Sequence, residues 1–498
     1  MTAALTPRPR LLVLIDGTEI TPALAAALSE TVLRQGLGAS AALELTFADP
    51  LAAHSLKPGL SVAALIDGRA VFSGRITQLR EDSGSAGRTV DLVARDAMIR
   101  LARRQTLRAL ADVSAGDVAA LLAADLGLDS LSLEPTPKRT LVLQHEQTDL
   151  DFLADLAGQA GLFPILRDGR LMLMSLAGDG DEPIPLVLGR NLHACEVALA
   201  ADRWLDGGTI HSRDPVSLKP RASSLTLARQ DRVVDMHDPG ADPPSGQRML
   251  LNRLAATDAE AEAMAQATLD RAAADTAVAE GLAEGNADLQ PGRTVMVDGV
   301  LPALAGGYVV TRTLHRLSAT EGYVTEFSTE APRLRPAPRT PMVALGRVSD
   351  DADPDGLGRC RIVLPDFGDL DAGWMASIAA GAGRRRGVVA LPLKGDDVLV
   401  LFPEGDPARG FVLGGLFGAQ TLPSGAARSP HGIVLRSQGG QILDLGGGGG
   451  ALKIATSGGS LLEMGPDEVR LAAAADLLIE APKRTITIRA GAIRFERG

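Results

Sequence analysis

The strongest candidate for a metal site in this 498-residue sequence is the acidic run Asp351-Ala-Asp353-Pro-Asp355-Gly356. It imitates the opening of an EF-hand loop, in which carboxylates at alternate positions bind calcium and a bidentate glutamate follows at position twelve. Position twelve is Ile362 here, and the flanking segments have the pattern of strands rather than helices. The run is therefore predicted to be a polar turn.

Histidines provide two further candidates. Asp235, His237 and Asp238 combine carboxylates with an imidazole, which are common metal ligands, but they lie in a loop rich in Pro and Gly. Metal binding is therefore disfavoured there. His315 follows the run VVTRTL, and nothing in the sequence indicates catalytic partners for it. We expect His315 to be a hydrogen-bonded structural residue.

The runs of glycine and arginine also have simple structural explanations. Gly446 to Gly450 could cradle a phosphate, but no Lys-Ser/Thr pair and no helix follow, so a loose turn is predicted. Arg384, Arg385 and Arg386 lie in an acidic protein, which favours a solvated turn or an intersubunit contact over a nucleic-acid site. No serine occurs in a Gly-x-Ser-x-Gly motif. We predict no catalytic residue, no cofactor and no metal.

The composition agrees with a non-catalytic, turn-rich protein of several domains. The chain has 55 glycines and 30 prolines at 45% hydrophobic residues, and 498 residues are too many for one core. Aromatic residues make up only 3%, so stacking platforms for sugars or bases are scarce. The net charge of −11 argues against a nucleic-acid partner.

The cysteines and the N-terminus bear on where the protein is made. Cys195 and Cys360 lie far apart with no metal or disulfide spacing, as expected for small buried residues in a reducing compartment. The apolar run LLVLI near the N-terminus is too short for a signal peptide, and no stretch has the length of a membrane span. We expect a protein made in the cytoplasm without a signal peptide, and any exit must use other machinery.

The first two thirds of the chain alternate between strand and helix patterns. Strands with a hairpin turn at Asp67-Gly68 predict a β-barrel module over residues 1–104. Residues 105–189 form a small α/β insert, with helices that begin after Ser114 and Thr148 and a hairpin at Asp168-Gly169. A second β-barrel module is expected over residues 190–335, interrupted by one Ala-rich helix from Thr257 to about Ala277.

A Pro-rich linker, residues 332–341, then leads to a compact barrel at 336–420. Five or six short strands with Gly-rich turns in this segment suit a Greek-key barrel such as an OB-fold.

The tail, residues 432–498, repeats apolar pairs at alternate positions with polar residues between and short glycine-rich breaks. Such a repeat is typical of stacked short strands in a β-solenoid or β-helix; an ordinary small antiparallel sandwich is the alternative. One chain cannot close a core with two inward residues per strand, so we expect three chains to intertwine as a triple-stranded β-helix, here called the needle. Its core is predicted to consist of Ile433, Leu435, Leu443, Leu445, Leu452, Ile454, Leu462, Met464, Val469, Leu471, Leu477, Ile479, Ile486 and Ile488.

Two blocks resemble a known family. GRVSDDADPDGLGRCRIVLP and WMASIAAGAGRRRGVVALPLKGDDVLVLFPEGDPARGFVLGGLF are similar to the OB-fold of phage baseplate spikes and VgrG proteins. The segment QHEQTDLDFLADLAGQAGLFPILRDGRL, and the block from Ala259 through GYVVTRTLHRLSATEGYVTEF, resemble the hub of these spikes. The resemblance covers nearly the whole chain.

This resemblance implies a non-enzymatic structural part of a contractile injection system, in which a trimeric hub meets the hexameric inner tube, an OB collar follows and the needle pierces the target. The implied partners are two further copies of the chain, the inner tube protein, baseplate proteins, a PAAR-like tip protein and effector cargo, with the target membrane engaged only by mechanical puncture. A phage tail, a type VI secretion system and an extracellular injection particle all fit.

Two departures concern enzymatic activity. Only about a dozen residues separate barrel and needle, which leaves no room for the lysozyme domain of the best-known phage spike, and the chain ends three residues after Phe495, without an effector domain. Ile493, Arg494, Phe495 and Glu496 are expected to bind the tip protein because this end exposes an apolar strand face. The alternative is a trimeric β-helical tailspike enzyme or adhesin acting on surface polysaccharide, but the needle has no Trp or Tyr to bind sugars.

Overall fold

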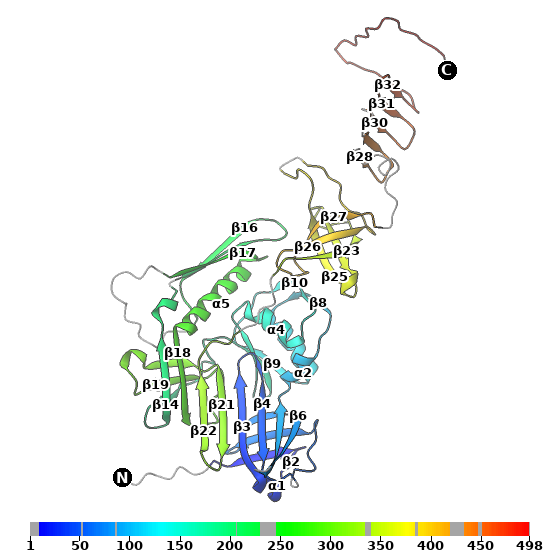
Figure 1. The fold of residues 1–498 in the computed structure, drawn as a ribbon. Helices are drawn as coiled ribbons and strands as arrows, with labels where there is room; N and C mark the ends of the chain where they lie inside the picture. The colour runs from blue at the N-terminus through cyan, green and yellow to red at the C-terminus, as the bar shows by residue number, and fades with distance from the viewer. Residues whose placement is uncertain are drawn as a thin grey trace. The chain divides into compact units, whose positions relative to one another are not determined.

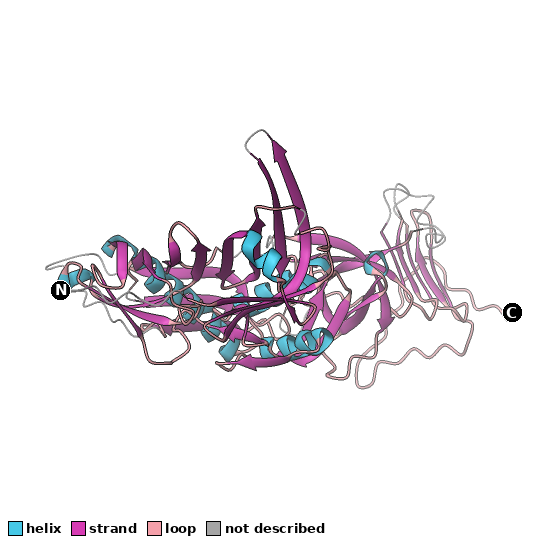
Figure 2. Cartoon of the chain, turned by 90° about the horizontal axis from the view of Figure 1, so that it is seen from below, coloured by secondary structure: helices cyan, strands magenta, loops and turns pink. Residues whose placement is uncertain are grey.

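The structure is a computed structural model that describes residues 9–50, 53–84, 87–205, 207–229, 246–333, 340–383, 387–418, 433–446 and 451–497. The predictions for Asp235, His237 and Asp238, for Arg384 to Arg386, and for most of the glycine run at 446–450 fall outside these residues. The chain is mainly β and divides into two compact units, Met1–Gly415 and Leu416–Gly498, each described here by itself (Figures 1 and 2).

An eleven-stranded sheet dominates the first unit (Figure 1). In spatial order its strands are β14 (Leu192–Leu199), β18 (Ala277–Glu284), β22 (Gly322–Ser328), β21 (Arg312–Ser318), β3 (Leu28–Gly36), β4 (Ala39–Phe47), β7 (Gly87–Arg95), β6 (Arg69–Gly84), β5 (Ser61–Ile66), β1 (Leu11–Ile15) and β2 (Thr18–Glu19). β3 pairs with β21 in antiparallel fashion, with Leu33 opposite His315. Strands of the two predicted barrel modules therefore share one sheet, a long-range pairing that local periodicity cannot reveal.

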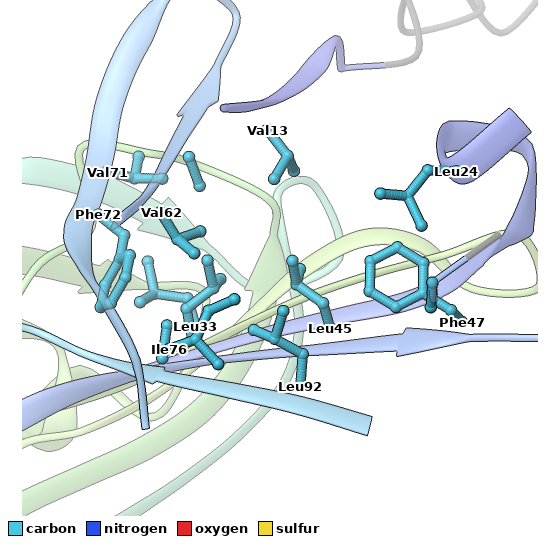
Figure 3. Close-up of a cluster of buried hydrophobic side chains, with 14 of the residues drawn as sticks. Val13, Leu24, Leu33, Leu45, Phe47, Val62, Val71, Phe72, Ile76 and Leu92 are labelled. Carbon is cyan, nitrogen blue, oxygen red and sulfur yellow. The ribbon is translucent and has the colours of Figure 1, made fainter. Parts of the chain in front are cut away.

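The N-terminal half of this sheet has its own apolar core (Figure 3). Leu43, Leu45 and Phe47 alternate along β4 and are fully buried, as expected for one face of a strand. Helix α1 (Pro22–Ala27), capped by Thr21, places Leu24 beside Phe47. The two-residue turn Asp67-Gly68 between β5 and β6 has φ angles of 52° and 83°, which confirms the predicted hairpin and explains the glycine.

The insert forms the predicted small α/β structure. Its elements are α2 (Met98–Arg103), β8 (Arg108–Val113), α3 (Ala115–Leu126), β9 (Asp129–Ser132), β10 (Arg139–Gln144), α4 (Asp149–Gly158), β11 (Phe163–Arg167) and β12 (Arg170–Met174). Ser114 and Asp117 form a capping box on α3, and Gly127 ends it in the left-handed conformation at φ 74°. Thr148 caps α4. These local signals were all readable in the sequence.

Two smaller sheets complete the hub part of the chain. β13 (Ile184–Val187), β19 (Thr294–Asp298) and β20 (Gly306–Val309) form one, and β16 (Pro220–Leu225), β15 (Gly207–Arg213) and β17 (Gln247–Leu254) form the other. The predicted Ala-rich helix is α5 (Asp258–Thr276), capped by Thr257, and it packs on the second sheet through Ala261, Met264 and Ala265 (Figure 1). Short 3-10 turns lie at Ala201–Arg203, Pro302–Leu304 and Pro365–Phe367.

The predicted OB-fold is a closed five-stranded barrel. Its strands, in spatial order, are β23 (Met342–Asp350), β24 (Arg359–Leu364), β25 (Leu370–Ser377), β27 (Phe411–Leu416) and β26 (Asp397–Phe402). Val348, Ile362, Val400, Phe402 and Val412 fill its core. The five strands agree with the five or six short strands expected from the sequence. The barrel strands and their order support the collar expected from the resemblance.

The second unit contains a five-stranded antiparallel meander. Its strands are β28 (Ile433–Arg436), β29 (Ile442–Leu445), β30 (Leu452–Ala455), β31 (Leu461–Met464) and β32 (Val469–Ala472). No strand forms over the described residues 473–497, so the three predicted strand pairs at Leu477/Ile479, Ile486/Ile488 and Ile493/Phe495 are absent from the single chain. A strand needs a neighbour for its hydrogen bonds, and within this chain these segments have none among the described strands.

Candidate interaction surfaces

The meander sorts the needle residues onto one face. The register places Ile433, Leu445, Leu452, Met464 and Val469 in one row across the five strands, and Leu435, Leu443, Ile454, Leu462 and Leu471 in a second row beside it. Because side chains alternate along a strand, both rows project from the same face. The sequence periodicity thus becomes a continuous apolar surface.

None of these ten side chains is buried within the chain, and their exposure reaches 68% at Val469. The opposite face carries charges that alternate in sign from strand to strand, Asp444 opposite Lys453, Lys453 opposite Glu463 and Glu463 opposite Arg470. Opposite charges on adjacent strands are favourable and well suited to solvent. The charged row of this face is therefore suited to water, while the ten residues of the apolar face remain partly or largely exposed.

The remaining predicted needle residues and the predicted tip surface are also exposed. Leu477, Ile479, Ile486 and Ile488 are all at least half exposed and lie outside strands. Ile493, Arg494, Phe495 and Glu496 are exposed as well, with Phe495 at 94%. An aromatic side chain with so much of its surface open to water is typical of a residue that another surface covers.

The acidic run that imitates a calcium loop is closed by an arginine. The Asp353 carboxylate accepts hydrogen bonds from the Arg359 guanidinium, at 2.7 Å, and from the backbone N–H groups of Asp355, Leu357 and Arg359. The bond from Arg359 holds the pKa of Asp353 well below its usual range. A calcium ion would need these same oxygens, so the geometry fits the polar turn expected from the sequence.

His315 is a buried structural residue. Its Nδ1 atom lies 3.0 Å from the Tyr323 hydroxyl and 3.1 Å from Oγ1 of Thr325, both on the neighbouring strand β22. Burial lowers the pKa of His315 to about 4, so the imidazole is neutral at pH 7. Across the described parts of the chain, no group of three or more His, Cys, Asp or Glu side chains is placed to hold a metal. No helix in those parts is long and apolar enough to cross a membrane.

No pattern in the sequence indicated the contacts between the barrel and the preceding part of the chain. Arg409, in the loop between β26 and β27, forms a 2.9 Å ion pair with Glu260 of α5. Glu404 accepts a hydrogen bond from the Leu254 backbone N–H at 3.1 Å. Partners about 150 residues apart cannot be paired by inspection of a single sequence.

Comparison with known families finds a match for each of two parts of the first unit, residues 23–321 and the closed barrel. The sequence model of the phage tail baseplate hub (GPD) matches residues 23–321, more than half of the chain. The chain belongs to this family. The model of the type VI secretion system/phage-baseplate injector OB domain matches residues 344–417 of the same baseplate hub protein, which coincides with the closed barrel. The resemblance seen in the sequence is thereby confirmed.

Solved structures share the fold of this baseplate hub at low sequence identity. A component of the E. coli type VI secretion system, described as similar to tail proteins of bacteriophage T4, has a TM-score of 0.51 at 15% identity and covers 81% of this chain and 99% of its own. The lidded PdpA–VgrG complex of Francisella gives 0.55 at 8% identity, over 95% and 81% of the two chains. Its lidless form gives 0.52 at 8%, over 93% and 98%. No curated protein sequence matches the chain.

Proposed function

We propose that this baseplate hub is the non-enzymatic hub and spike of a contractile, phage-tail-like injection system, and that it adapts a hexameric inner tube to a trimeric membrane-piercing needle. The observation that carries the proposal is the uncovered two-row apolar face of the meander. A hub and an OB collar in the same chain supply the parts that such a needle requires.

Three copies of the chain would cover that apolar face. Full burial of a Leu, Ile, Val or Met side chain contributes roughly 1.5–3 kcal/mol, so ten such residues per chain offer a large driving force. Closed three-fold symmetry of intertwined chains would also satisfy the free strand edges. The alternating charges then form the outer, solvated surface.

The same arrangement accounts for the expected partners. Baseplate hub and VgrG-type families are structural, which supports a mechanical role with the inner tube protein, other baseplate proteins, a PAAR-like tip protein and effector cargo. The protein would be made in the cytoplasm and built into a particle that engages the target membrane by puncture. Contraction would push the assembled needle forward as a rod.

Light scattering on the full-length protein tests the trimer. We expect a mass three times that of the 51.7 kDa chain. A monodisperse monomer would contradict the needle. Electron microscopy of the native particle should place the protein on the axis of the baseplate, and density elsewhere would remove the proposed role. Hydrolysis of peptidoglycan or capsule by the purified protein would overturn the non-enzymatic assignment.

The tip surface has its own test. Deletion of residues 490–498 removes Ile493, Arg494, Phe495 and Glu496, and we expect it to abolish capture of the purified PAAR-like tip protein encoded with the particle. A second variant replaces Ile493 and Phe495 by serine, which keeps the length, removes only the apolar side chains and should also weaken capture. Undiminished capture by both variants would show that the tip protein binds elsewhere.

A further inference from the structure

The joint between collar and hub contains a buried ionic cluster built from three separate parts of the chain. Arg139 comes from β10 of the insert, Glu260 from α5, and Asp406 and Arg409 from the collar. Arg409 is 8% exposed and Glu260 only 1%. Such strongly desolvated charges are rare on the surface of a tethered domain and mark a fixed contact.

Each member of the cluster has specific partners. Arg409 donates to Glu260 Oε2 at 2.9 Å, donates to the Leu254 carbonyl, and lies 3.4 Å from Oδ2 of Asp406. Glu260 Oε2 also accepts from the Ala256 backbone N–H at 3.2 Å. The collar side chain thereby holds the end of β17 and the start of α5 together. Removal of Glu260 would leave Arg409 with Asp406, which is 34% exposed, as its remaining ion-pair partner.

Arg139 completes the cluster from the insert. Its Nη2 donates to Gln159 Oε1 at 2.6 Å, and Glu260 and Asp406 lie near enough to favour its charged form. Burial, together with the Arg409 cation, lowers the pKa of Arg139 to about 10. The positive and negative charges of this site therefore balance one another only when the groups from both the hub and the collar are present.

Apolar packing joins the same parts. Along β10, Val142 belongs to the core of the insert, whereas Leu141 and Leu143 on the other face pack into the core of the barrel. The His145 and Phe367 rings meet edge to face with centroids 5.9 Å apart. One strand of the insert therefore serves two cores, which a flexible tether would not produce.

We propose that this joint is a rigid coupling, in which Arg409 and Glu260 lock the collar to the hub so that both move as one body. Hub and collar then unfold together. The inference that this joint transmits thrust rests on the proposed function. The coupling itself is a property of the isolated protein.

Calorimetry and amide exchange on the full-length protein test the coupling. We expect hub and collar of the wild type to unfold in one cooperative transition. Arg409→Met should separate a collar transition and lower its midpoint by about 10 °C or more, because buried Glu260 loses its ion-pair partner across the joint. The Leu254 amide, bonded to Glu404 across the joint, should exchange at least tenfold faster.

Two further variants keep the test decisive. Glu260→Gln keeps the size of the side chain and should also separate the collar transition from that of the hub. This variant tests the coupling even where Arg409→Met does not fold. Arg347→Met is the matched control, because Arg347 forms an exposed ion pair with Asp397 on the same barrel, 3.3 Å long and 60% exposed on the arginine. One shared transition and unchanged Leu254 exchange in Arg409→Met and Glu260→Gln would overturn the coupling, whatever the particle does.

Discussion

Arg359 decides the chemistry of the acidic run in the collar. By donating to Asp353 it takes the place that a calcium ion would occupy and closes the turn between β23 and β24. The backbone N–H groups of Asp355, Leu357 and Arg359 add further donors to the same carboxylate. With these hydrogen-bond partners, the charged carboxylate of Asp353 stabilises the loop.

Replacement of Asp353 by asparagine tests that role. We expect Asp353→Asn to lower the free energy of unfolding by about 1–3 kcal/mol at pH 7, since a charged acceptor is lost. The pKa of Asp353 is lowered in the folded protein, so its stabilisation is present above the ordinary carboxyl pKa and is lost as the pH falls through the folded value. Denaturant titrations at pH 7 and below pH 4 should therefore show the difference between variant and wild type shrink in acid. An undiminished difference would contradict this account.

Buried His315 should make stability depend on pH in another range. Its pKa of about 4 in the folded protein lies below the unfolded value of 6.5, so the stabilisation is complete above pH 6.5 and declines as the pH falls toward 4. The difference amounts to about 3 kcal/mol for the full shift. We expect wild type to lose more stability between pH 7 and 4 than His315→Asn, measured by denaturant unfolding at each pH. Parallel pH profiles for the two proteins would exclude this histidine as the cause.

At the scale of elements, alternation along short strands separates the two faces of the needle sheet. Leu462 lies in the middle of an apolar row, between Ile454 and Leu471, while its neighbour Glu463 belongs to the charged row on the other face. Adjacent residues of one strand are thus expected to respond in opposite ways to substitution.

The pair Leu462 and Glu463 provides a matched test. We expect Leu462→Asp to prevent formation of the proposed trimer and leave a monomer, because a carboxylate in each copy would be buried on the common axis without a partner. Glu463→Gln, on the solvated face, should leave the trimer intact and change stability by less than about 0.5 kcal/mol. Light scattering at a series of concentrations distinguishes the two. A trimer in both variants would place the contact on another face.

Helix caps and hairpin turns act at the same scale but only locally. Ser114 with Asp117, Thr148, and the turn Asp67-Gly68 each satisfy backbone groups within a few residues. For this reason they are readable in the sequence and do not depend on which distant element packs on them. They set where elements begin and end, and leave open which strands pair.

At the scale of the whole molecule, the division into two compact units implies that hub and collar do not need the needle to fold. The first unit has several apolar cores of its own, including those of the eleven-stranded sheet, the insert and the barrel. The ten side chains on the apolar face of the second unit, by contrast, are not buried by the residues that the structure describes.

A truncation after residue 432 tests this division. We expect the shortened protein to be folded, with an unfolding temperature within about 3 °C of the hub and collar transition of the full chain, because the cores of the first unit are intact. It should no longer form a stable trimer, because the ten apolar needle residues are gone. Calorimetry and light scattering measure both properties. An unfolded fragment would show that the first unit depends on the needle.

Much of this architecture was accessible from the sequence. The collar barrel, the insert, the Ala-rich helix and the alternation in the tail all follow from patterns spanning a few residues. At Leu477 to Phe495 alternation predicts strands that do not form in the single chain, which has no neighbour among the described strands to pair with them, so strands in an assembled needle stay a prediction. Periodicity shows which residues of a strand share a face, but it does not identify the neighbouring strand that pairs with it.

The sequence by itself determined the order of parts and the residues with one dry face, because these depend on local spacing and on the types of neighbouring residues, while the family followed from the resemblance of whole blocks. Only the tertiary structure decided which distant segments meet. It joined β3 to β21 in one sheet, aligned the needle residues into two rows and placed Arg409 against Glu260, 149 positions earlier. Such contacts depend on chain closure over long distances, and no local pattern encodes their partner.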